Sequence, residues 1–306
     1  MTEHIPAPRE KARPTAREIR SLAEVASAVS MRNFHRHLHS GDGHPVVIAP
    51  SFMTSDIGSA VMRQALRRAG YAAYGWEQGL NTGLREKVYR NYERHVLDLV
   101  SRHGRKASLV GWSLGGIYAR SLAHRRPEYV RQVITLGSPV NIPEMRGVSG
   151  PVAKLYEMLN PGALSDPMLS WRDEWKRTPN VPSTAMYSAS DGIVDWQYCV
   201  HEQPGPEAEN LRVPASHMGM THNLAVLYAL SDRLAQAEGK WQPFSLSGIR
   251  QHLYAVSHTL QTARALFQDI KKGSLRCPFS LPPFSGTQTI SLWGPPQQWR
   301  QRHQTS

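Results

Sequence analysis

Cysteine is nearly absent from this chain of 306 residues, which contains only Cys199 and Cys277. Two isolated cysteines cannot build the disulfide framework that is typical of small secreted proteins. The sequence also has no apolar run as long as a membrane span. Its polar first residues, Met1 to Pro6, do not provide the apolar segment of a secretory signal peptide. These absences predict a cytoplasmic protein.

Motifs that bind metals, phosphates or nucleic acids are missing as well. We find no His-Glu-x-x-His pair, no Cys and His cluster at ligand spacing and no glycine-rich phosphate loop, and therefore expect no metal and no cofactor. The formal net charge of +12 suggests a nucleic-acid partner, but residues 246–306 alone carry seven Lys or Arg against one acid. No motif that reads DNA or RNA accompanies them. A solvated basic tail, without a nucleic-acid partner, is the simpler interpretation.

Apolar runs alternate with helical patterns through the middle of the chain. Strand-like runs lie at 45–49, 71–76, 106–110, 130–136 and 183–188, with a last strand near 211–213, and helical patterns include 84–103, 114–123 and 224–235. Such alternation is typical of an α/β fold with a doubly wound, mostly parallel sheet.

Two segments flank this core and one interrupts it. Residues 1–40 are predicted to be a helical appendage, because a capping box precedes an apolar stripe at helical spacing. Residues 41–245 form the predicted main domain. Within it, the apolar insertion at about 140–182 is favoured as a cap over the site, with a packed excursion as the alternative. Residues 246–306 are predicted to hold a C-terminal helix and a poorly ordered basic tail.

The predicted C-terminal helix is based on an apolar stripe. From Ile249 to Ile270 apolar residues recur at alternating spacings of four and three. A helix docked on its own domain is the usual meaning of such a stripe. A homodimer or a peripheral membrane contact through the helix 249–270 are the alternatives.

The most informative motif is Gly111-Trp112-Ser113-Leu114-Gly115, which follows a short apolar strand and precedes a helix. A Gly-x-Ser-x-Gly in this context is typical of a nucleophile elbow, where a tight strand-to-helix turn exposes a serine hydroxyl. A Cβ at either glycine is expected to collide with the neighbouring strand or helix. Ser113 is therefore the candidate nucleophile.

A serine nucleophile needs a histidine to accept its proton and a carboxylate to orient that histidine. Asp191 stands a few residues beyond a predicted strand and His217 stands on the loop after the last one, so both follow Ser113 in the required order. Asp191 could instead form only an Asx-turn. Two alternatives remain: Asp195, placed like a helix N-cap, and His222, beside a helix start.

An acyl transfer also needs two backbone N–H groups that face the developing oxyanion. Leu114, directly after the nucleophile, is expected to supply one of them. Phe52, on the loop after the first core strand, is best placed to supply the other.

Four segments together resemble bacterial α/β-hydrolases of the lipase and esterase type, namely 110–120, 133–139, 190–194 and 216–219. The resemblance covers roughly residues 44–245. It implies Ser113 as nucleophile, Asp191 as acid and His217 as base. One departure is Ser51, because relatives usually carry glycine there, where the backbone approaches the substrate closely.

The leading hypothesis is a serine hydrolase that cleaves carboxylic esters of small-molecule or lipid-like substrates. It would act through an acyl-enzyme on Ser113, with His217 as general base. An acyltransferase could use the same residues, since water exclusion decides which acceptor takes the acyl group. A thioesterase is the other alternative on the same residues, because the sequence does not distinguish an ester from a thioester substrate. A catalytically silent binding module is the third hypothesis, and Ser51 is the only feature that favours it.

Overall fold

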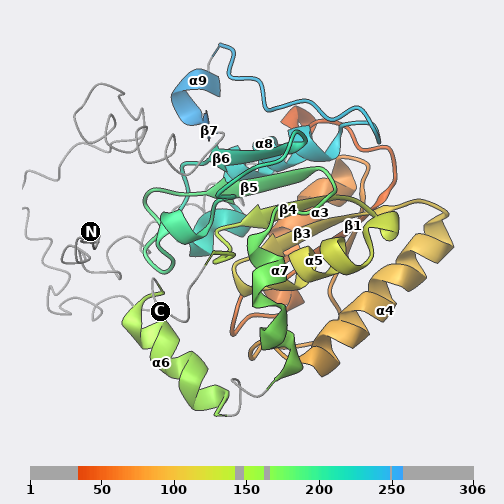
Figure 1. Ribbon diagram of the computed structural model, residues 1–306. Helices are drawn as coiled ribbons and strands as arrows, with labels where there is room; N and C mark the ends of the chain where they lie inside the picture. Colours follow the sequence, from red (N-terminus) through yellow and green to blue (C-terminus); the bar gives the residue numbers. More distant parts are fainter. Residues whose placement is uncertain (1–33, 142–147, 162–165, 249, 258–306) are drawn as a thin grey trace, which may run out of the picture.

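In the computed structural model, the part of the chain that is described comprises residues 34–141, 148–161, 166–248 and 250–257. Seven strands in these residues form one sheet, in the order β2-β1-β3-β4-β5-β6-β7. The strands are β1 (Pro45–Ala49), β2 (Ala72–Gly75), β3 (Ala107–Trp112), β4 (Val130–Leu136), β5 (Ser183–Tyr187), β6 (Ala208–Arg212) and β7 (Ala255–Ser257). All neighbours pair in parallel except β6 and β7 (Figure 1). The predicted doubly wound, mostly parallel sheet is confirmed.

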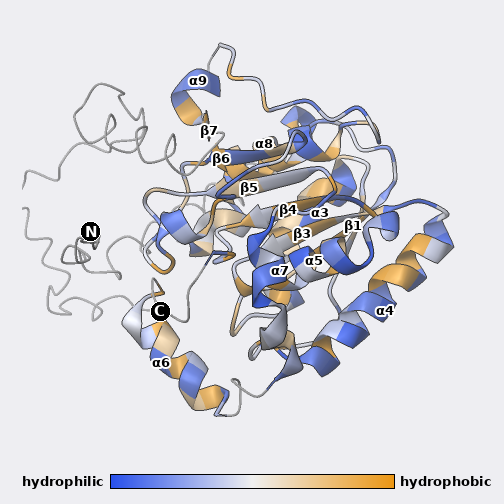
Figure 2. Ribbon diagram, in the orientation of Figure 1, coloured by the Kyte–Doolittle hydropathy of each residue, from blue (hydrophilic) through white to orange (hydrophobic). Residues whose placement is uncertain are grey.

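Helices cover both faces of the sheet, and the central strands are therefore buried on both sides. The helices are α3 (Ala60–Arg68), α4 (Glu86–His103), α5 (Leu114–Arg125), α6 (Gly150–Leu159), α7 (Arg172–Lys176), α8 (Leu224–Leu234) and α9 (Arg250–Leu253). In β1, Val46 and Ile48 face α3 and α8, while Val47 and Ala49 face α4 and α5. The central strands are accordingly hydrophobic, whereas α4 alternates hydrophobic and hydrophilic residues (Figure 2).

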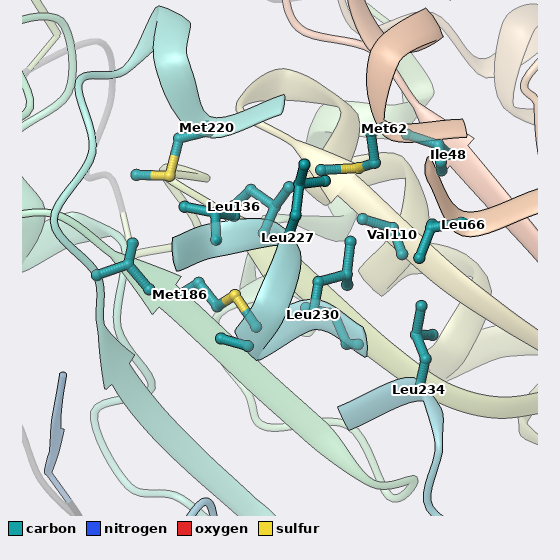
Figure 3. Packing of buried hydrophobic residues seen from close by; sticks show 14 of the residues in the cluster. Ile48, Met62, Leu66, Val110, Leu136, Met186, Met220, Leu227, Leu230 and Leu234 are labelled. Atoms are coloured by element: carbon teal, nitrogen blue, oxygen red, sulfur yellow. The ribbon is translucent and has the colours of Figure 1, made fainter. Parts of the chain in front are cut away.

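The core on the α3 and α8 side is a close-packed aliphatic layer. Met62 and Leu66 from α3 and Leu227 and Leu230 from α8 are almost completely buried against the strands (Figure 3). Fully burying such a side chain contributes roughly 1.5–3 kcal/mol. This layer packs α3 and α8 on one face of the sheet.

The insertion between β4 and β5 contains α6 and α7, which differ in how they pack on the domain. Trp175 of α7 is buried in the core, and the guanidinium of Arg120 donates to the carbonyls of Trp175 and Arg177 at 2.7 and 2.6 Å. This part of the insertion is packed against α5. In contrast, α6 stands outside the sheet layers (Figure 1). The predicted appendage at 1–40 lies almost wholly outside the described residues.

The prediction of one helix over 249–270 is wrong where the structure describes it. The short helix α9 ends at Leu253, and Ala255–Ser257 then pairs with β6 as the antiparallel strand β7. Between them Tyr254 packs its ring 4.9 Å from that of Phe244 and is buried in the core. The open edge of β6 offers backbone partners that a continuing helix would leave unused. The rest of the stripe, from 258 on, lies outside the described residues.

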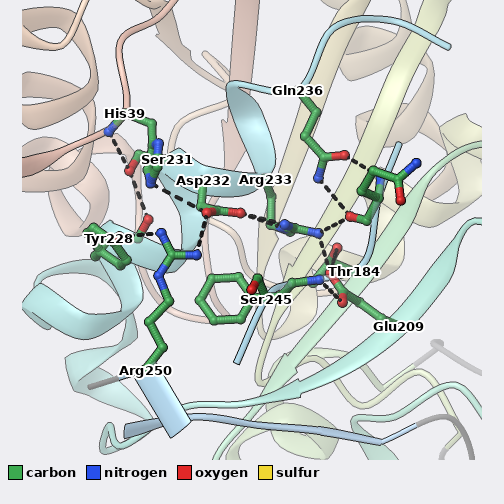
Figure 4. Close-up of polar contacts among 12 residues, drawn as sticks. His39, Thr184, Glu209, Tyr228, Ser231, Asp232, Arg233, Gln236, Ser245 and Arg250 are labelled. Carbon is green, nitrogen blue, oxygen red and sulfur yellow. Dashed lines mark hydrogen bonds and ion pairs between the residues drawn. The ribbon is translucent and has the colours of Figure 1, made fainter. Parts of the chain in front are cut away.

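Polar contacts attach the segment after α8 to the body (Figure 4). Glu209 of β6 is fully buried and accepts from the guanidinium of Arg233 and from the backbone N–H of Phe244, both at 2.8 Å. Arg250 pairs with Asp232 at 3.2 Å. These contacts make the chain beyond residue 245, as far as β7, part of the same core. No helix in the described ranges combines the length and apolar character needed to cross a bilayer.

A second group of polar residues lies at the amino ends of the strands. His44 and Ser108 are both fully buried, and the His44 Nδ1–H donates to Asp42 at 2.5 Å. The Ser108 hydroxyl donates to Nε2 of His44 at 2.8 Å. Asp42 also pairs with Arg105 and Arg131 at 2.5 and 2.8 Å. Burial lowers the pKa of His44 from 6.5 to about 4, although the bond to Asp42 opposes this.

We predict that His44 makes the protein acid-sensitive. The unfolded chain protonates this histidine below pH 6.5, but the folded chain does so only near pH 4. Stability is therefore fully present above pH 6.5 and is lost as the pH falls towards 4, by on the order of 3 kcal/mol. Between pH 7 and 4.5, the free energy of unfolding measured with urea should fall by about 2 kcal/mol less in His44→Gln than in the wild type. Equal losses in both proteins would contradict this assignment.

Candidate active site

The turn between β3 and α5 consists of one strained residue. Trp112 ends the strand, Leu114 begins the helix, and Ser113 between them has φ 53° and ψ −121°. This left-handed conformation costs a residue with a Cβ roughly 1–3 kcal/mol, so the surrounding structure must impose it. The N–H of Ser113 donates to the carbonyl of Leu136 at 2.8 Å, which ties the turn to β4. This is the geometry expected of a nucleophile elbow.

Glycines let the elbow close this tightly. A Cβ on Gly111 would lie 2.2 Å from the Cα of Gly116 in the elbow helix. A Cβ on Gly115 would lie 2.2 Å from the carbonyl oxygen of Ala49 at the end of β1. Both collisions predicted from the sequence are confirmed. The following Gly116 is equally constrained, since its Cβ would lie 2.0 Å from Oγ of Ser138.

The structure brings Asp191 and His217 together. Asp191 follows β5, His217 follows β6, and Oδ2 of Asp191 lies 2.6 Å from Nδ1 of His217. Both side chains are 1% exposed. The other oxygen, Oδ1, accepts the backbone N–H groups of Ile193 and Val194, each at 2.8 Å. Asp191 thus forms the Asx-turn and also holds the histidine.

The alternative residues have other positions. Asp195 caps the short 3-10 helix Trp196–Tyr198, where its side chain accepts from the N–H of Gln197 at 3.2 Å. This is the N-cap position expected from the sequence. His222 ends the 3-10 helix Met218–Thr221, and its Nδ1 lies 3.3 Å from the Thr221 hydroxyl.

Trp112 links the histidine loop to the elbow, a contact that the sequence did not predict. Its indole N–H donates to the backbone carbonyl of His217 at 3.1 Å, and its ring is buried. The residue before Ser113 therefore fixes the backbone of His217. The strained serine follows β3, the carboxylate follows β5 and the histidine follows β6. Because these strands run parallel in one sheet, all three residues lie at its carboxyl edge. The chain has the α/β-hydrolase fold.

The two predicted oxyanion donors also lie at this edge of the α/β-hydrolase sheet. Gly115 packs directly on the backbone of Ala49 and Pro50, which brings the loop carrying Phe52 against the start of α5. Among the residues that the structure describes, the backbone N–H groups of Phe52 and Leu114 have no protein acceptor. Both groups are therefore unused by the fold itself.

Serine in place of glycine at position 51 does not strain this loop. The left-handed residue is Met53, with φ 58°, and Ser51 has no positive φ. The carbonyl of Ser51 accepts from the N–H and the hydroxyl of Thr54 at 3.1 and 2.8 Å. The loop thus turns at Met53, and position 51 does not require a glycine here.

Comparison with solved structures finds distant similarity to several enzymes. No family model and no curated protein matches the chain. It is similar to Bacillus licheniformis lipase BlEst2, at 19% identity over 64% of this chain and 94% of that one, with a TM-score of 0.46. Aspergillus fumigatus lipase B shows 13% identity over 68% and 58%, with a TM-score of 0.45. A thioesterase domain from the curacin biosynthetic pathway shows 13% over 65% and 93%, with a TM-score of 0.42. Identities this low carry no activity from one chain to another.

A cavity of about 680 Å³ lies elsewhere on the molecule. Residues 176–181, before β5, and residues between 202 and 208, before β6, line it. It therefore opens at the amino ends of these strands, whereas Ser113, Asp191 and His217 follow the carboxyl ends of theirs. This cavity is separate from the candidate site.

Gly137 is a further residue of the site, at the end of β4. Its φ is 55°, and a Cβ there would lie 3.2 Å from Oδ2 of Asp191 and 3.3 Å from Nδ1 of His217. A residue with a Cβ would be strained at this φ and would crowd the Asp191 and His217 side chains. The sequence shows a glycine here, but only the fold places it beside the acid and the base.

We expect Gly137→Ala to lower the rate of any reaction that uses this pair at least about tenfold, because small displacements of reacting groups are costly. The matched control is Gly104→Ala, since Gly104 has φ 60° and no neighbour within 4 Å of its would-be Cβ. Both variants should lose about 1 kcal/mol of stability through the positive φ. Kinetics and urea unfolding separate the two effects, and equal activities would contradict the placement of Gly137.

Proposed function

We propose that the protein is a serine hydrolase that cleaves carboxylic esters. Ser113 is the nucleophile, His217 the general base and Asp191 the orienting acid. The observation that carries this proposal is the buried 2.6 Å pair of Asp191 and His217, tied by Trp112 to the strained turn at Ser113. A serine, a histidine and a carboxylate in this order and position supply the groups that acyl transfer needs.

The geometry suggests how the groups share the reaction. Asp191 accepts the Nδ1–H of His217, which leaves the Nε2 lone pair to take the proton of the serine hydroxyl. The Ser113 oxygen then forms a bond to the ester carbonyl carbon, and the carbonyl oxygen becomes an oxyanion. Collapse expels the alcohol, which receives the proton from His217. Water, deprotonated by His217, then attacks the acyl carbon. The bond to the Ser113 oxygen breaks, the acid is released, and the serine oxygen takes back its proton from His217.

The oxyanion is proposed to bind the backbone N–H groups of Phe52 and Leu114. Neither group has another protein acceptor in the described part of the chain. Each such donor typically lowers the barrier by about 3–4 kcal/mol, since it is in place before the charge develops.

Apolar side chains near these groups favour an ester with an apolar acyl or alcohol part. Phe52 packs on Tyr156 of α6, while Met53 and Leu80, on loops after β1 and β2, are 40% and 50% exposed. The substrate is accordingly proposed to be a small-molecule or lipid-like ester, and α6 is proposed to be part of a cap. The cytoplasm remains the proposed compartment, on the grounds of the sequence alone.

A series of p-nitrophenyl esters from acetate to palmitate tests this proposal on the full-length protein. We expect release of nitrophenol and of the free acid, with a kcat/KM that depends on chain length. Ser113→Ala should abolish it. If no ester of any length is cleaved, or if the acyl group passes to an added alcohol and never to water, the proposed hydrolase function is wrong.

A further inference from the structure

The helix α6 is held at two places that both belong to the candidate site. Ahead of the helix, Val148 pairs with Val194, and the N–H of Ser149 donates to the carbonyl of Ile193 at 2.7 Å. Ile193 and Val194 are the residues whose N–H groups bind Asp191. The start of α6 is thus attached to the loop that carries the acid.

The other end of α6 reaches the loop that carries the proposed oxyanion donor. Tyr156 is 7% exposed, and its ring lies 5.3 Å from that of Phe52 at an interplanar angle of 55°. The Tyr156 hydroxyl accepts the N–H of Leu84 at 3.2 Å. One turn later, the Asn160 side chain donates to the carbonyl of Thr82 at 2.8 Å. The side chain of Phe52 therefore rests on a ring that is itself fixed.

Asn81 holds the backbone of the same loop. It is fully buried, and its side-chain amide donates to the carbonyl of Pro50 at 2.8 Å. Its own carbonyl accepts the N–H of Met53 at 2.7 Å, and its own N–H donates to the carbonyl of Thr54 at 2.8 Å. These three bonds lie on both sides of Phe52 in the chain, and none of them uses the Phe52 N–H.

We propose that Tyr156 and Asn81 are positioning residues for the oxyanion hole. Asn81 fixes the backbone before and after Phe52, and Tyr156 fixes its side chain, so that the Phe52 N–H stays directed at the developing oxyanion. This inference rests on the proposed function. A donor is useful only where its position is preset, and a displacement of about 1 Å can cost up to about a hundredfold in rate.

The test compares kcat and KM for the best p-nitrophenyl ester. Tyr156→Ala and Asn81→Ala should each lower kcat about 10- to 100-fold and leave KM within about threefold, since only the transition state carries the oxyanion. Tyr156→Phe keeps the ring on Phe52 and should retain kcat within about threefold. The matched control is Glu157→Ala, because Glu157 is the exposed neighbour on α6 and should behave as the wild type.

A second measurement separates positioning from general damage to the fold. An alkylboronic acid, which forms a tetrahedral adduct on the serine, should bind Tyr156→Ala more weakly by the same factor as kcat falls. Thermal melting of each variant checks folding, and Tyr156→Leu replaces Tyr156→Ala if the latter does not fold. Normal kcat in Tyr156→Ala or Tyr156→Leu, or equal loss in Tyr156→Phe, would overturn the inference.

The two proposals fail in different ways. If the wild type reacts with a fluorophosphonate but cleaves no ester, the hydrolase proposal alone fails. The rate of fluorophosphonate labelling then replaces kcat, and it should be about 10-fold lower in Tyr156→Ala than in the wild type. A wild type that does not react with the probe at all would overturn both proposals.

Discussion

Replacing His217 by alanine is expected to lower kcat for ester hydrolysis by about 10⁶-fold, which is the scale of losing the base of a serine triad. On the proposed mechanism the Ser113 hydroxyl then has no proton acceptor, and the residual rate comes from the proposed oxyanion donors and substrate binding. The buried pair with Asp191 and the hydrogen bond from Trp112 hold His217 in place. We therefore expect no neighbouring side chain to take over its role. Steady-state kinetics at pH 8 measure the effect.

His222→Ala is the control for this variant. His222 is the nearest alternative in the sequence, and its Nδ1 contacts the Thr221 hydroxyl. We expect its kcat to stay within about threefold of the wild type, because this side chain contacts Thr221 and not Asp191. A large loss in His222→Ala together with a small one in His217→Ala would assign the base to His222.

Asp191→Asn should lower kcat by about 10⁴-fold, although the change is isosteric. An amide on the Nδ1 side can donate to the imidazole, which favours the tautomer that carries its proton on Nε2 and cannot accept from Ser113. The backbone N–H groups of Ile193 and Val194 would keep the other side-chain oxygen in place. The loss should therefore appear in kcat, with circular dichroism unchanged.

Asp195→Asn is the matched control, four residues away. It alters the cap of the helix Trp196–Tyr198, and asparagine caps about as well as aspartate. Both activity and stability should remain close to those of the wild type. A near-normal rate in Asp191→Asn with a large loss in Asp195→Asn would transfer the role of the acid to Asp195.

Most of the sheet and the elbow could be predicted because both depend on local sequence patterns. Buried parallel strands are continuous apolar runs, and Val130–Leu136 was predicted with the bounds that the structure shows. Gly111 and Gly115 were predicted from sterics alone to be required at the turn. A Cβ on either glycine would indeed lie 2.2 Å from a backbone atom. The pairing of Asp191 with His217 followed from chain order after their strands.

Contacts between distant segments were not predictable in the same way. The heptad stripe at 249–270 has the same periodicity whether a helix continues or ends, and only the free edge of β6 decides that Ala255–Ser257 is a strand. Gly137 lies in the segment 133–139 that resembles the family, but neither that segment nor the sequence around Asn81 and Tyr156 indicates which groups these residues contact. Their proximity to the site depends on the tertiary fold.

The buried group of Asp42, His44 and Ser108 shows why geometry by itself does not identify a nucleophile. Its two bonds, of 2.5 and 2.8 Å, have the order of a serine triad. Ser108, however, lies within strand β3, is fully buried and has no positive φ. Ser113 differs in all three respects, since it is at a turn, 7% exposed and strained. Position on the sheet edge therefore decides which serine is proposed to react.

The most direct test of this account is to find which serine a fluorophosphonate probe modifies. The account predicts one equivalent of label on the peptide that contains Ser113, with no label in Ser113→Ala and full label in Ser108→Ala, both read by mass spectrometry. Label that persists in Ser113→Ala, or that maps to any other residue, would contradict it.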